Sequence, residues 1–281
     1  MRRHPRQRAA LAVGVGLAAL LCSASPALAQ SYLGGNLRPF AILGATTVTC
    51  TGGSVITGDL GVSPGSAVTG FPVPCSDVGT IHAADATAAA AQVDLTTAFN
   101  TLTAQSCGLD LSGTDLGGLT LNPGIYCFSS SAGLTGTLTL NGLGNPSSVW
   151  VFITGSTLTT AGNVVFTNGG NACGVQWRVG SSATIGSGSQ FAGNILAQTS
   201  VTLVSGANLI GRALARTGAV TLDNNQVSFA ACGAGSGAGG APPPFPGVPV
   251  PTLSQWALIT LTCLLVMAGI IALRRRRPIG D

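Results

Sequence analysis

The sequence predicts a mainly β fold in which short strands stack into a solenoid, with one long α-helix alongside. Three observations support this fold class. A short unit recurs between residues 149 and 228, strand-favouring Val, Ile, Leu and Thr fill that unit, and one helical stripe lies between residues 80 and 105. Because the unit is too short for a pair of helices, each turn of the stack should consist of strands joined by tight bends.

The recurring unit ends in a threonine, with an apolar residue directly before it and a small residue two positions before it. The unit returns at intervals of roughly 20 residues, which is typical of a solenoid. Its copies end at Thr159, Thr184, Thr202 and Thr221, and two earlier units that end at Thr49 and Thr135 fit the same frame.

Side chains alternate along a strand, so Leu158, Ala183 and Val201 should share the inner side while the threonines after them point outward. Exposed sheets normally carry charges that prevent aggregation, but this surface has no Lys, Arg or Glu. That absence indicates a function, although the preference of Thr for strands could by itself produce the column. The candidate site residues are Thr47, Thr49, Thr135, Thr157, Thr159, Ser182, Thr184, Ser200, Thr202, Ala219 and Thr221.

The charge distribution argues against nucleic acid as a partner. The formal net charge of +4 comes from arginines in the two tails, whereas the part between Gln30 and Pro251 is weakly acidic and Lys is absent. Nucleic-acid binding needs a basic patch, which this part does not supply. We expect no metal and no cofactor, because His82 is its only histidine and it contains no Cys-x-x-Cys pair.

Residues 1–29 have the features of a secretory signal peptide. Arg2 to Arg8 form a basic segment, Ala9 to Leu21 an apolar segment, and Ala27-Leu28-Ala29 a small-residue cleavage site. The mature chain is expected to start near Gln30. An uncleaved membrane anchor is the alternative, but the apolar segment is short for a span.

The other end of the chain contains a linker and a membrane segment. Residues 233–250 are rich in Gly, Ser and Pro, as flexible and then stiffer linkers are. The apolar run 256–273 is just long enough to cross a bilayer, and Arg274 to Arg277 should stay cytoplasmic. Residues 251–281, with Pro251-Thr252-Leu253 at their start, resemble the IPTL-type C-terminal sorting signal of Gram-negative bacteria. The resemblance implies membrane retention, then processing with display at the cell surface or release; permanent anchoring is the alternative.

The cysteines of the exported part suggest disulfides, because their number is even and export exposes them to oxidising conditions. Pairing in chain order would join Cys50 to Cys75, Cys107 to Cys127 and Cys173 to Cys232, and other connectivities stay open.

Along the chain, residues 31–75 read as a first block of short strands, and a helix is expected at about 81–105. The helix should pack on the side of the solenoid that carries Trp150 and Phe152, which we expect to point outward. From Ile125 to Ser228 the chain should form coil after coil, with Asn at the glycine-rich corners. The apolar stripe of the helix consists of Ala84, Ala88, Ala91, Leu95, Phe99 and Leu102.

Several segments together resemble the microbial ice-binding protein family, over about residues 33–229. They are Thr57–Gly65, the Ala-rich helix Asp85–Asn100, Gly118–Tyr126, Gly193–Ala197 and Gly211–Arg216. The resemblance implies a discontinuous right-handed β-helix of triangular cross-section, flanked by one long α-helix, with the early block inserted as a coil among the later ones. It also implies adsorption to ice by one flat face.

We therefore expect residues 30–232 to form an ice-binding domain, a monomer without enzymatic activity that inhibits ice growth and recrystallisation. A surface adhesin or spacer without ice affinity is the alternative. A carbohydrate-active β-helix enzyme is disfavoured, because Lys and Glu are absent and the Asp residues are scattered. Another face of the solenoid stays open as the site, in particular the one with Thr167, Gln190, Ile210 and Val227.

Overall fold

The computed structural model describes residues 32–229. The expected signal peptide (1–29), linker (233–250) and membrane run (256–273) lie outside the described residues. Within residues 32–229, no helix has both the length and the apolar character needed to cross a membrane.

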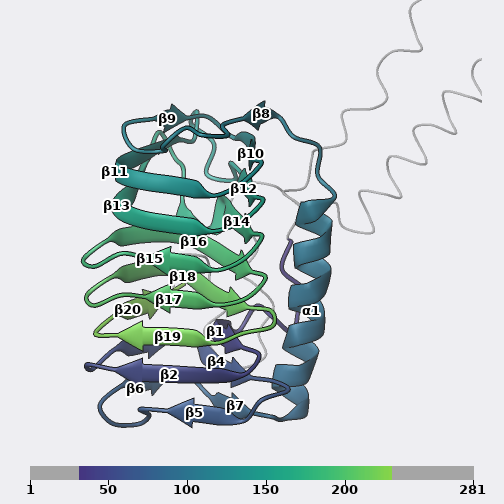
Figure 1. The fold of residues 1–281 in the computed structure, drawn as a ribbon, viewed down its shortest axis with the longest axis vertical. Helices are drawn as coiled ribbons and strands as arrows, with labels where there is room; N and C mark the ends of the chain where they lie inside the picture. The colour runs from purple at the N-terminus through teal and green to yellow at the C-terminus, as the bar shows by residue number, and fades with distance from the viewer. Residues whose placement is uncertain (1–31, 230–281) are drawn as a thin grey trace, which may run out of the picture. The chain divides into compact units, whose positions relative to one another are not determined.

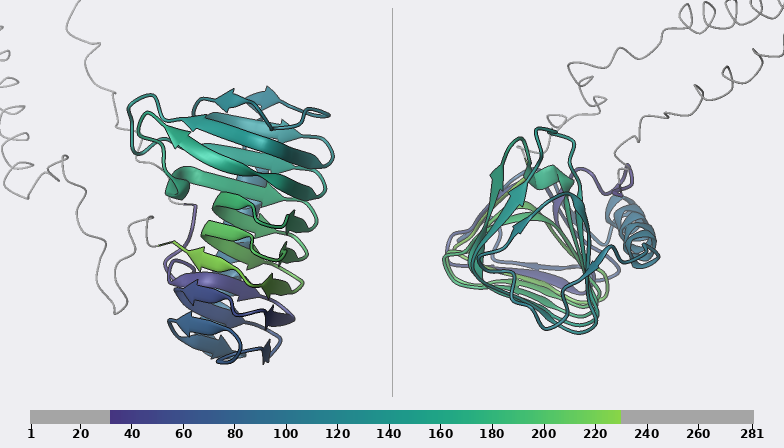
Figure 2. Two further views of the ribbon diagram at one scale, coloured as in Figure 1. Left: turned by 90° about the vertical axis from the view of Figure 1, so that its left-hand side faces the viewer. Right: turned by 90° about the horizontal axis from the view of Figure 1, so that it is seen from above.

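The described chain is a stack of coils with a triangular cross-section (Figures 1 and 2). Successive coils place equivalent strands side by side in parallel, so each side of the triangle is a parallel sheet. We call the side with the threonines of the repeat the threonine face and the side on which the long helix packs the helix face. The remaining side is called the third face. The expected solenoid of strands with one long helix is thus found.

The threonine face is the front of the stack in Figure 1 and lies in an eight-stranded sheet. The long strands β11 and β13 continue past this face, around a corner at Gly136, whose φ is +95°. In spatial order the strands are β5 (Ala67–Thr69), β2 (Thr47–Thr51), β19 (Val220–Asp223), β17 (Val201–Leu203), β15 (Ala183–Ile185), β13 (Leu158–Thr167), β11 (Ala132–Asn141) and β9 (Thr120–Leu121).

The other two sides share a 12-stranded sheet. Its strands β16 (Gln190–Ala197) and β18 (Asn208–Ala215) bend at Gly193 and Gly211, where φ is positive. Their first halves lie on the third face with β6 (Ser76–Val78), β3 (Val55–Thr57) and β20 (Gln226–Ser228). Their second halves lie on the helix face with β8 (Leu109–Asp110), β10 (Gly124–Phe128), β12 (Trp150–Thr154), β14 (Val175–Val179), β1 (Phe40–Gly44), β4 (Asp59–Val62) and β7 (Ile81–Ala83). A 3₁₀ turn, η1 (Ala172–Gly174), precedes β14.

Aromatic rings from successive coils stack inside the triangle. Phe152 lies 4.0 Å from Trp177 between ring centroids, and Tyr126 and Phe191 extend the stack on either side. Trp150 is also fully buried, and its Nε1 donates to Leu121 O at 3.1 Å. The expectation that Trp150 and Phe152 point outward toward the helix is therefore wrong: they fill the core.

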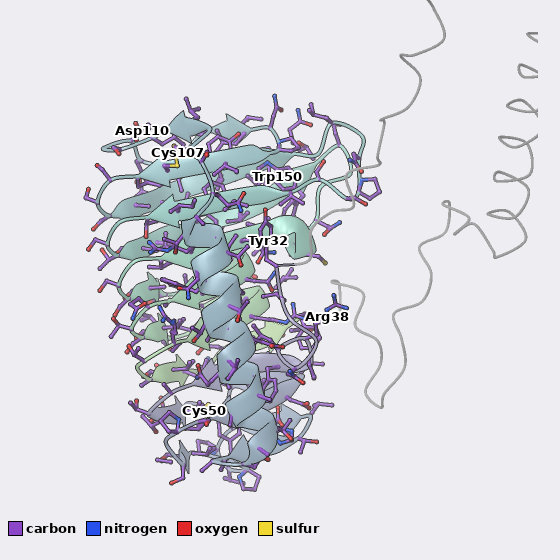
Figure 3. The ribbon with its side chains drawn as sticks, turned by 90° about the vertical axis from the view of Figure 1, so that its right-hand side faces the viewer. Tyr32, Arg38, Cys50, Cys107, Asp110 and Trp150 are labelled. Atoms are coloured by element: carbon purple, nitrogen blue, oxygen red, sulfur yellow. A yellow bond between two sulfur atoms is a disulfide. The ribbon has the colours of Figure 1, made fainter. Side chains whose placement is uncertain are left out.

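The long helix α1 runs from Ala86 to Thr103 and packs on the helix face (Figure 3). Its first turn is capped by Asp85, whose Oδ1 accepts from Ala88 N at 2.8 Å. Ala84, expected in the stripe, precedes the helix with φ +54° and is exposed. The buried stripe consists of Ala88, Ala91, Leu95, Ala98, Phe99 and Leu102, and it packs against a cluster that includes Leu43, Val151, Leu196 and Leu214.

Side chains of the helix face hold α1 in place. The guanidinium groups of Arg178 and Arg216 lie 4.4 and 5.0 Å from the centroid of the Phe99 ring. Arg178 also donates to Thr103 Oγ1, and Arg216 donates to Thr96 Oγ1.

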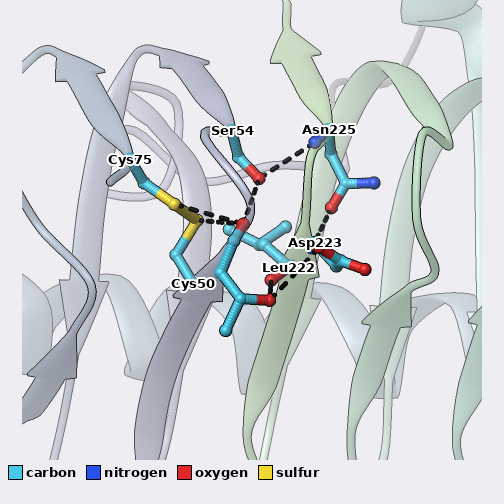
Figure 4. The surroundings of a disulfide bond; sticks show 7 residues. Cys50, Ser54, Cys75, Leu222, Asp223 and Asn225 are labelled. Atoms are coloured by element: carbon cyan, nitrogen blue, oxygen red, sulfur yellow. Dashed lines mark hydrogen bonds between the residues drawn. A yellow bond between two sulfur atoms is a disulfide. The ribbon is translucent and has the colours of Figure 1, made fainter. Parts of the chain in front are cut away.

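The early block is placed differently from the expectation. It is not inserted among the later coils but extends the stack beyond the last one, so that β2 pairs with β19, β3 with β20 and β1 with β18. The chain then travels along α1 to the opposite end and coils back (Figure 1). Side chains reinforce this junction: Ser54 Oγ accepts from Asn225 N at 2.9 Å, and Thr51 Oγ1 donates to Leu222 O at 3.2 Å (Figure 4).

Disulfides join Cys50 to Cys75 in the early block and Cys107 to Cys127 at the other end. The third expected pair, Cys173 with Cys232, stays a prediction because Cys232 lies outside the described residues.

One ionisable group faces the interior at the open end of the early block. Asp77 lies beside the buried Ile56 in the register of β6 with β3. Neither of its carboxylate oxygens has a hydrogen-bond partner within residues 32–229. Burial, and then the charge of Asp59, raise the pKa of Asp77 to about 6, against the opposing effect of His82.

A flat threonine face as the candidate functional site

A straight column of threonines runs up the middle of the threonine face. Pairing in register joins Thr69 to Thr49, Thr49 to Thr221, and so on through each coil. Most of these threonines stand between buried apolar neighbours, as Thr184 does between Ala183 and Ile185, so they point away from the core. The central column consists of Thr69, Thr49, Thr221, Thr202, Thr184 and Thr159.

The hydroxyls of the central column have no partner within the described chain, because none of the six threonines makes a side-chain hydrogen bond among residues 32–229. Their donors and acceptors are therefore available to water. A β-branched side chain on a strand has few rotamers, so these hydroxyls and their methyl groups are held in fixed positions.

The first flanking column lies two residues before the central one. Its hydroxyls are partly used inside the protein: Thr47 Oγ1 donates to Ala67 O at 2.9 Å, and Thr157 Oγ1 donates to Ser131 Oγ at 2.8 Å. These bonds tie neighbouring coils and leave less capacity for external water. The column consists of Ala67, Thr47, Ala219, Ser200, Ser182, Thr157 and Ser131.

Thr135 does not stand in the central column. It pairs with Ala161, and Gly133 is the residue beside Thr159. The register of β11 with β13 thus differs by two residues from the one that the repeat predicted. Thr135 belongs to a second flanking column, which lies two residues after the central one, and it is exposed at the corner of the face. This column has mixed composition, since it also contains Ala161, Thr51 and Asp223.

Two carboxylates border the face. Asp115 Oδ1 accepts from Thr135 N at 3.0 Å, Thr135 Oγ1 at 2.9 Å and Gly117 N at 2.7 Å. Burial alone would raise the pKa of Asp115, but these hydrogen bonds prevail and lower it. Asp223 Oδ1 accepts from Thr51 Oγ1 at 3.3 Å. Asp115 forms a β-bridge with Gly133 and so continues the line of the central column at its end, whereas Asp223 lies in the second flanking column. The six threonines themselves have no charged residue among them.

Sequence reasoning missed part of the face in the early block. Ala67-Val68-Thr69 has the same small–apolar–Thr pattern as Ala219-Val220-Thr221, and the structure places it in line with Thr47-Val48-Thr49. The signal was present, but the prolines and glycines around it favour a reading as a loop.

The other two sides differ in their chemistry. On the third face, amide side chains are bonded across coils: Asn163 Oδ1 accepts from Gln190 N, and Asn208 Oδ1 accepts from Gln226 N. Ile210 is 48% exposed there, whereas Val227 points into the core, contrary to the alternative surface that included it. The helix face is covered by α1. Among the described residues, no group of His, Cys, Asp or Glu could hold a metal ion.

Comparisons with known proteins identify the family and the fold. The family model described as Ice-binding-like matches residues 42–228, and the IPTL-CTERM motif matches residues 248–277. An ice-binding protein of Nostoc sp. (strain HG1) is 57% identical over 198 residues, which cover 70% of this chain and 73% of the relative.

Two solved structures show the same fold. The ice-binding protein from the ascomycete Antarctomyces psychrotrophicus has a TM-score of 0.67 and 41% identity, and the match covers 70% of this chain and 97% of that one. An ice-binding protein from an Antarctic biological consortium has a TM-score of 0.67 and 43% identity, covering 69% of this chain and 89% of that one.

Proposed function

The chain belongs to the ice-binding-like protein family, and we propose on that basis that it binds ice crystals through the threonine face and inhibits their growth and recrystallisation. The observation that carries the choice of face is the central column, whose hydroxyls stand in register without a partner in the described chain.

A surface that binds ice must accept a solid made of water. Charged side chains bind liquid water tightly and are costly to desolvate, and the central column avoids them. Threonine offers a methyl and a hydroxyl on a stiff stem, so little side-chain entropy is lost when water orders around it.

The sheet provides regular spacing in two directions. Neighbouring coils are about 4.8 Å apart, and positions two residues apart along a strand are separated by about 6.6 Å. Water at this grid of methyls and hydroxyls can adopt an ice-like arrangement and merge with the crystal. Each contact is weak, but a rigid face brings many together without a further ordering cost.

Firm adsorption explains the effect on crystal growth. Adsorbed molecules force the ice surface to advance between them as curved fronts. A curved front melts more easily than a flat one, so growth stops within an interval below the melting point. The same adsorption holds grain boundaries and slows recrystallisation.

The irregular flanks argue for moderate activity. Gly133 interrupts the central column at one end, Ala219 and Ala67 lack hydroxyls in the first flanking column, and Asp223 adds a charge to the second. Ordered water would thus extend over the middle of the face more readily than over its margins.

The test is to image a single ice crystal in purified domain below the melting point, with Thr184→Tyr as the face variant and Ile210→Tyr as its control on the third face. The bulky ring at Thr184 should hold the central column away from ice and abolish shaping, while the control behaves like wild type. Loss of shaping in the Ile210 variant alone would move the site to the third face.

We also propose that the protein is exported, with a signal peptide at 1–29 and a membrane segment at 256–273, in a Gram-negative bacterium. The IPTL-CTERM match supports sorting to the cell surface. In this proposal the domain is monomeric, uses no cofactor and catalyses no reaction.

A further inference from the structure

We infer that this protein attaches the cell that makes it to ice, because the described chain ends, at Phe229, on the edge opposite the threonine face. This inference rests on the proposed ice binding and adds a function to it. A released inhibitor needs no particular exit point, whereas a tethered one must keep its binding face turned away from the cell.

The described chain ends at the corner between the third face and the helix face. Strand β20 pairs with β18 at Ile210, directly before the bend at Gly211. Phe229 follows, is 7% exposed, and its ring lies 4.1 Å from the guanidinium carbon of Arg212. In the end-on view of Figure 2, this corner lies opposite the side formed by the threonine face.

The beginning of the described chain meets the same corner. Arg212 Nη2 donates to Arg38 O at 2.8 Å, and Leu33 and Tyr32 lie in the cluster under α1 (Figure 3). Both ends of the domain are therefore fixed by packed side chains on one edge. The threonine face carries neither end of the described chain.

The chain beyond this corner is long enough for a tether. Residues 230–247 separate the last described residue from the IPTL-CTERM motif at 248–277. Fully extended, such a segment spans at most about 60 Å. The eight strands of the threonine sheet occupy only about 35 Å along the stack. A domain held by this segment has room to lay its whole face on a crystal.

Tethering many copies on one cell would multiply their effect. Once one domain has bound, the others on the same surface meet ice at a high effective concentration, so the cell stays attached although single contacts open. This gain needs no new contact within the domain. It requires only that the binding face and the attachment point lie on opposite sides.

The experiment counts cells that remain on a cold ice surface after washing, using cells that produce the full chain. Three variants are compared with it: a chain that stops before residue 248, the full chain with Thr184→Tyr, and the full chain with Ile210→Tyr as the matched control. We expect the full chain and the Ile210 variant to retain cells, and the other two to retain on the order of a hundredfold fewer.

A parallel measurement separates this inference from the proposed function. Domain collected from the medium of the truncated chain is tested for ice shaping. Shaping by that domain, together with no adhesion of cells that make the full chain, would overturn the tether and leave ice binding intact. Adhesion that is unchanged by the truncation would overturn it as well. Absence of shaping by the domain would refute the proposed function itself.

Discussion

Replacing Thr184 and Thr202 together by valine removes two hydroxyls from the central column and leaves the shape of the face nearly unchanged. Neither hydroxyl makes a hydrogen bond within residues 32–229, and both side chains are only partly buried. The free energy of unfolding should therefore stay within about 0.5 kcal/mol of wild type. Ice affinity should fall, because the surface water loses two of its fixed anchors.

Thr47→Val is the matched control for this reasoning. Its Oγ1 donates to Ala67 O at 2.9 Å, so valine there removes a hydrogen bond that links two coils. A bond of this kind contributes about 1 kcal/mol to stability. Thr47→Val should thus destabilise the fold more than the double substitution, although it changes a single residue.

Denaturant unfolding measures the stability of wild type, the double variant and Thr47→Val, and an ice-recrystallisation assay on the same preparations measures their activity. Loss of more than about 1 kcal/mol in the double variant would mean that the central hydroxyls are bonded inside the protein, which contradicts the described geometry. Full inhibition of recrystallisation by a stable double variant would refute the role given to the hydroxyls.

Other predictions concern the margins of the face, the interior and the helix. Ala219→Thr should strengthen inhibition of recrystallisation by adding a methyl and a hydroxyl beside Thr221; a weaker variant with an unchanged fold would argue against the grid. The raised pKa of Asp77 means that its contribution to stability is present below pH 4 and is lost as the pH rises through about 6. Asp77→Asn should therefore raise the free energy of unfolding at pH 7 by about 1 kcal/mol, after allowance for partial exposure. The melting temperature of the variant should also depend less on pH between pH 5 and 7, and an unchanged pH profile would contradict this. Phe99→Ala should cost about 3 kcal/mol, because the buried ring joins α1 to Arg178 and the solenoid, and chemical denaturation would measure it.

Alternation along the strands was sufficient to predict which side chains of the repeats face outward. The units that end at Thr159, Thr184, Thr202 and Thr221 alternate cleanly between apolar and polar residues, and the structure places each of these threonines on the surface. The recurring Thr also predicted their register, and the strands pair with these threonines side by side.

Alternation did not reveal a shift by two residues. Such a shift keeps every side chain on its own side, so Gly133 and Thr135 both satisfy the pattern opposite Thr159. The ten-residue pairing of β11 with β13 decides between them, and it depends on contacts all the way from Ala132 to Asn141.

A strand that is buried on both sides carries no alternation at all. Val149 to Ile153 are all apolar, because one side packs in the core and the other under α1, and the sequence does not tell the two sides apart. The position of the early block is likewise set by long-range pairing of β2 with β19, which no local pattern in residues 31–75 encodes.

The central claim is that ice meets the threonine face, and partition into a growing ice hemisphere tests it most directly. Purified Thr202→Tyr and Ile210→Tyr domains, matched in folding by circular dichroism, are frozen side by side with wild type. The account predicts that the Ile210 variant enters the ice as wild type does and that the Thr202 variant stays in the liquid. Equal entry of both variants would contradict it.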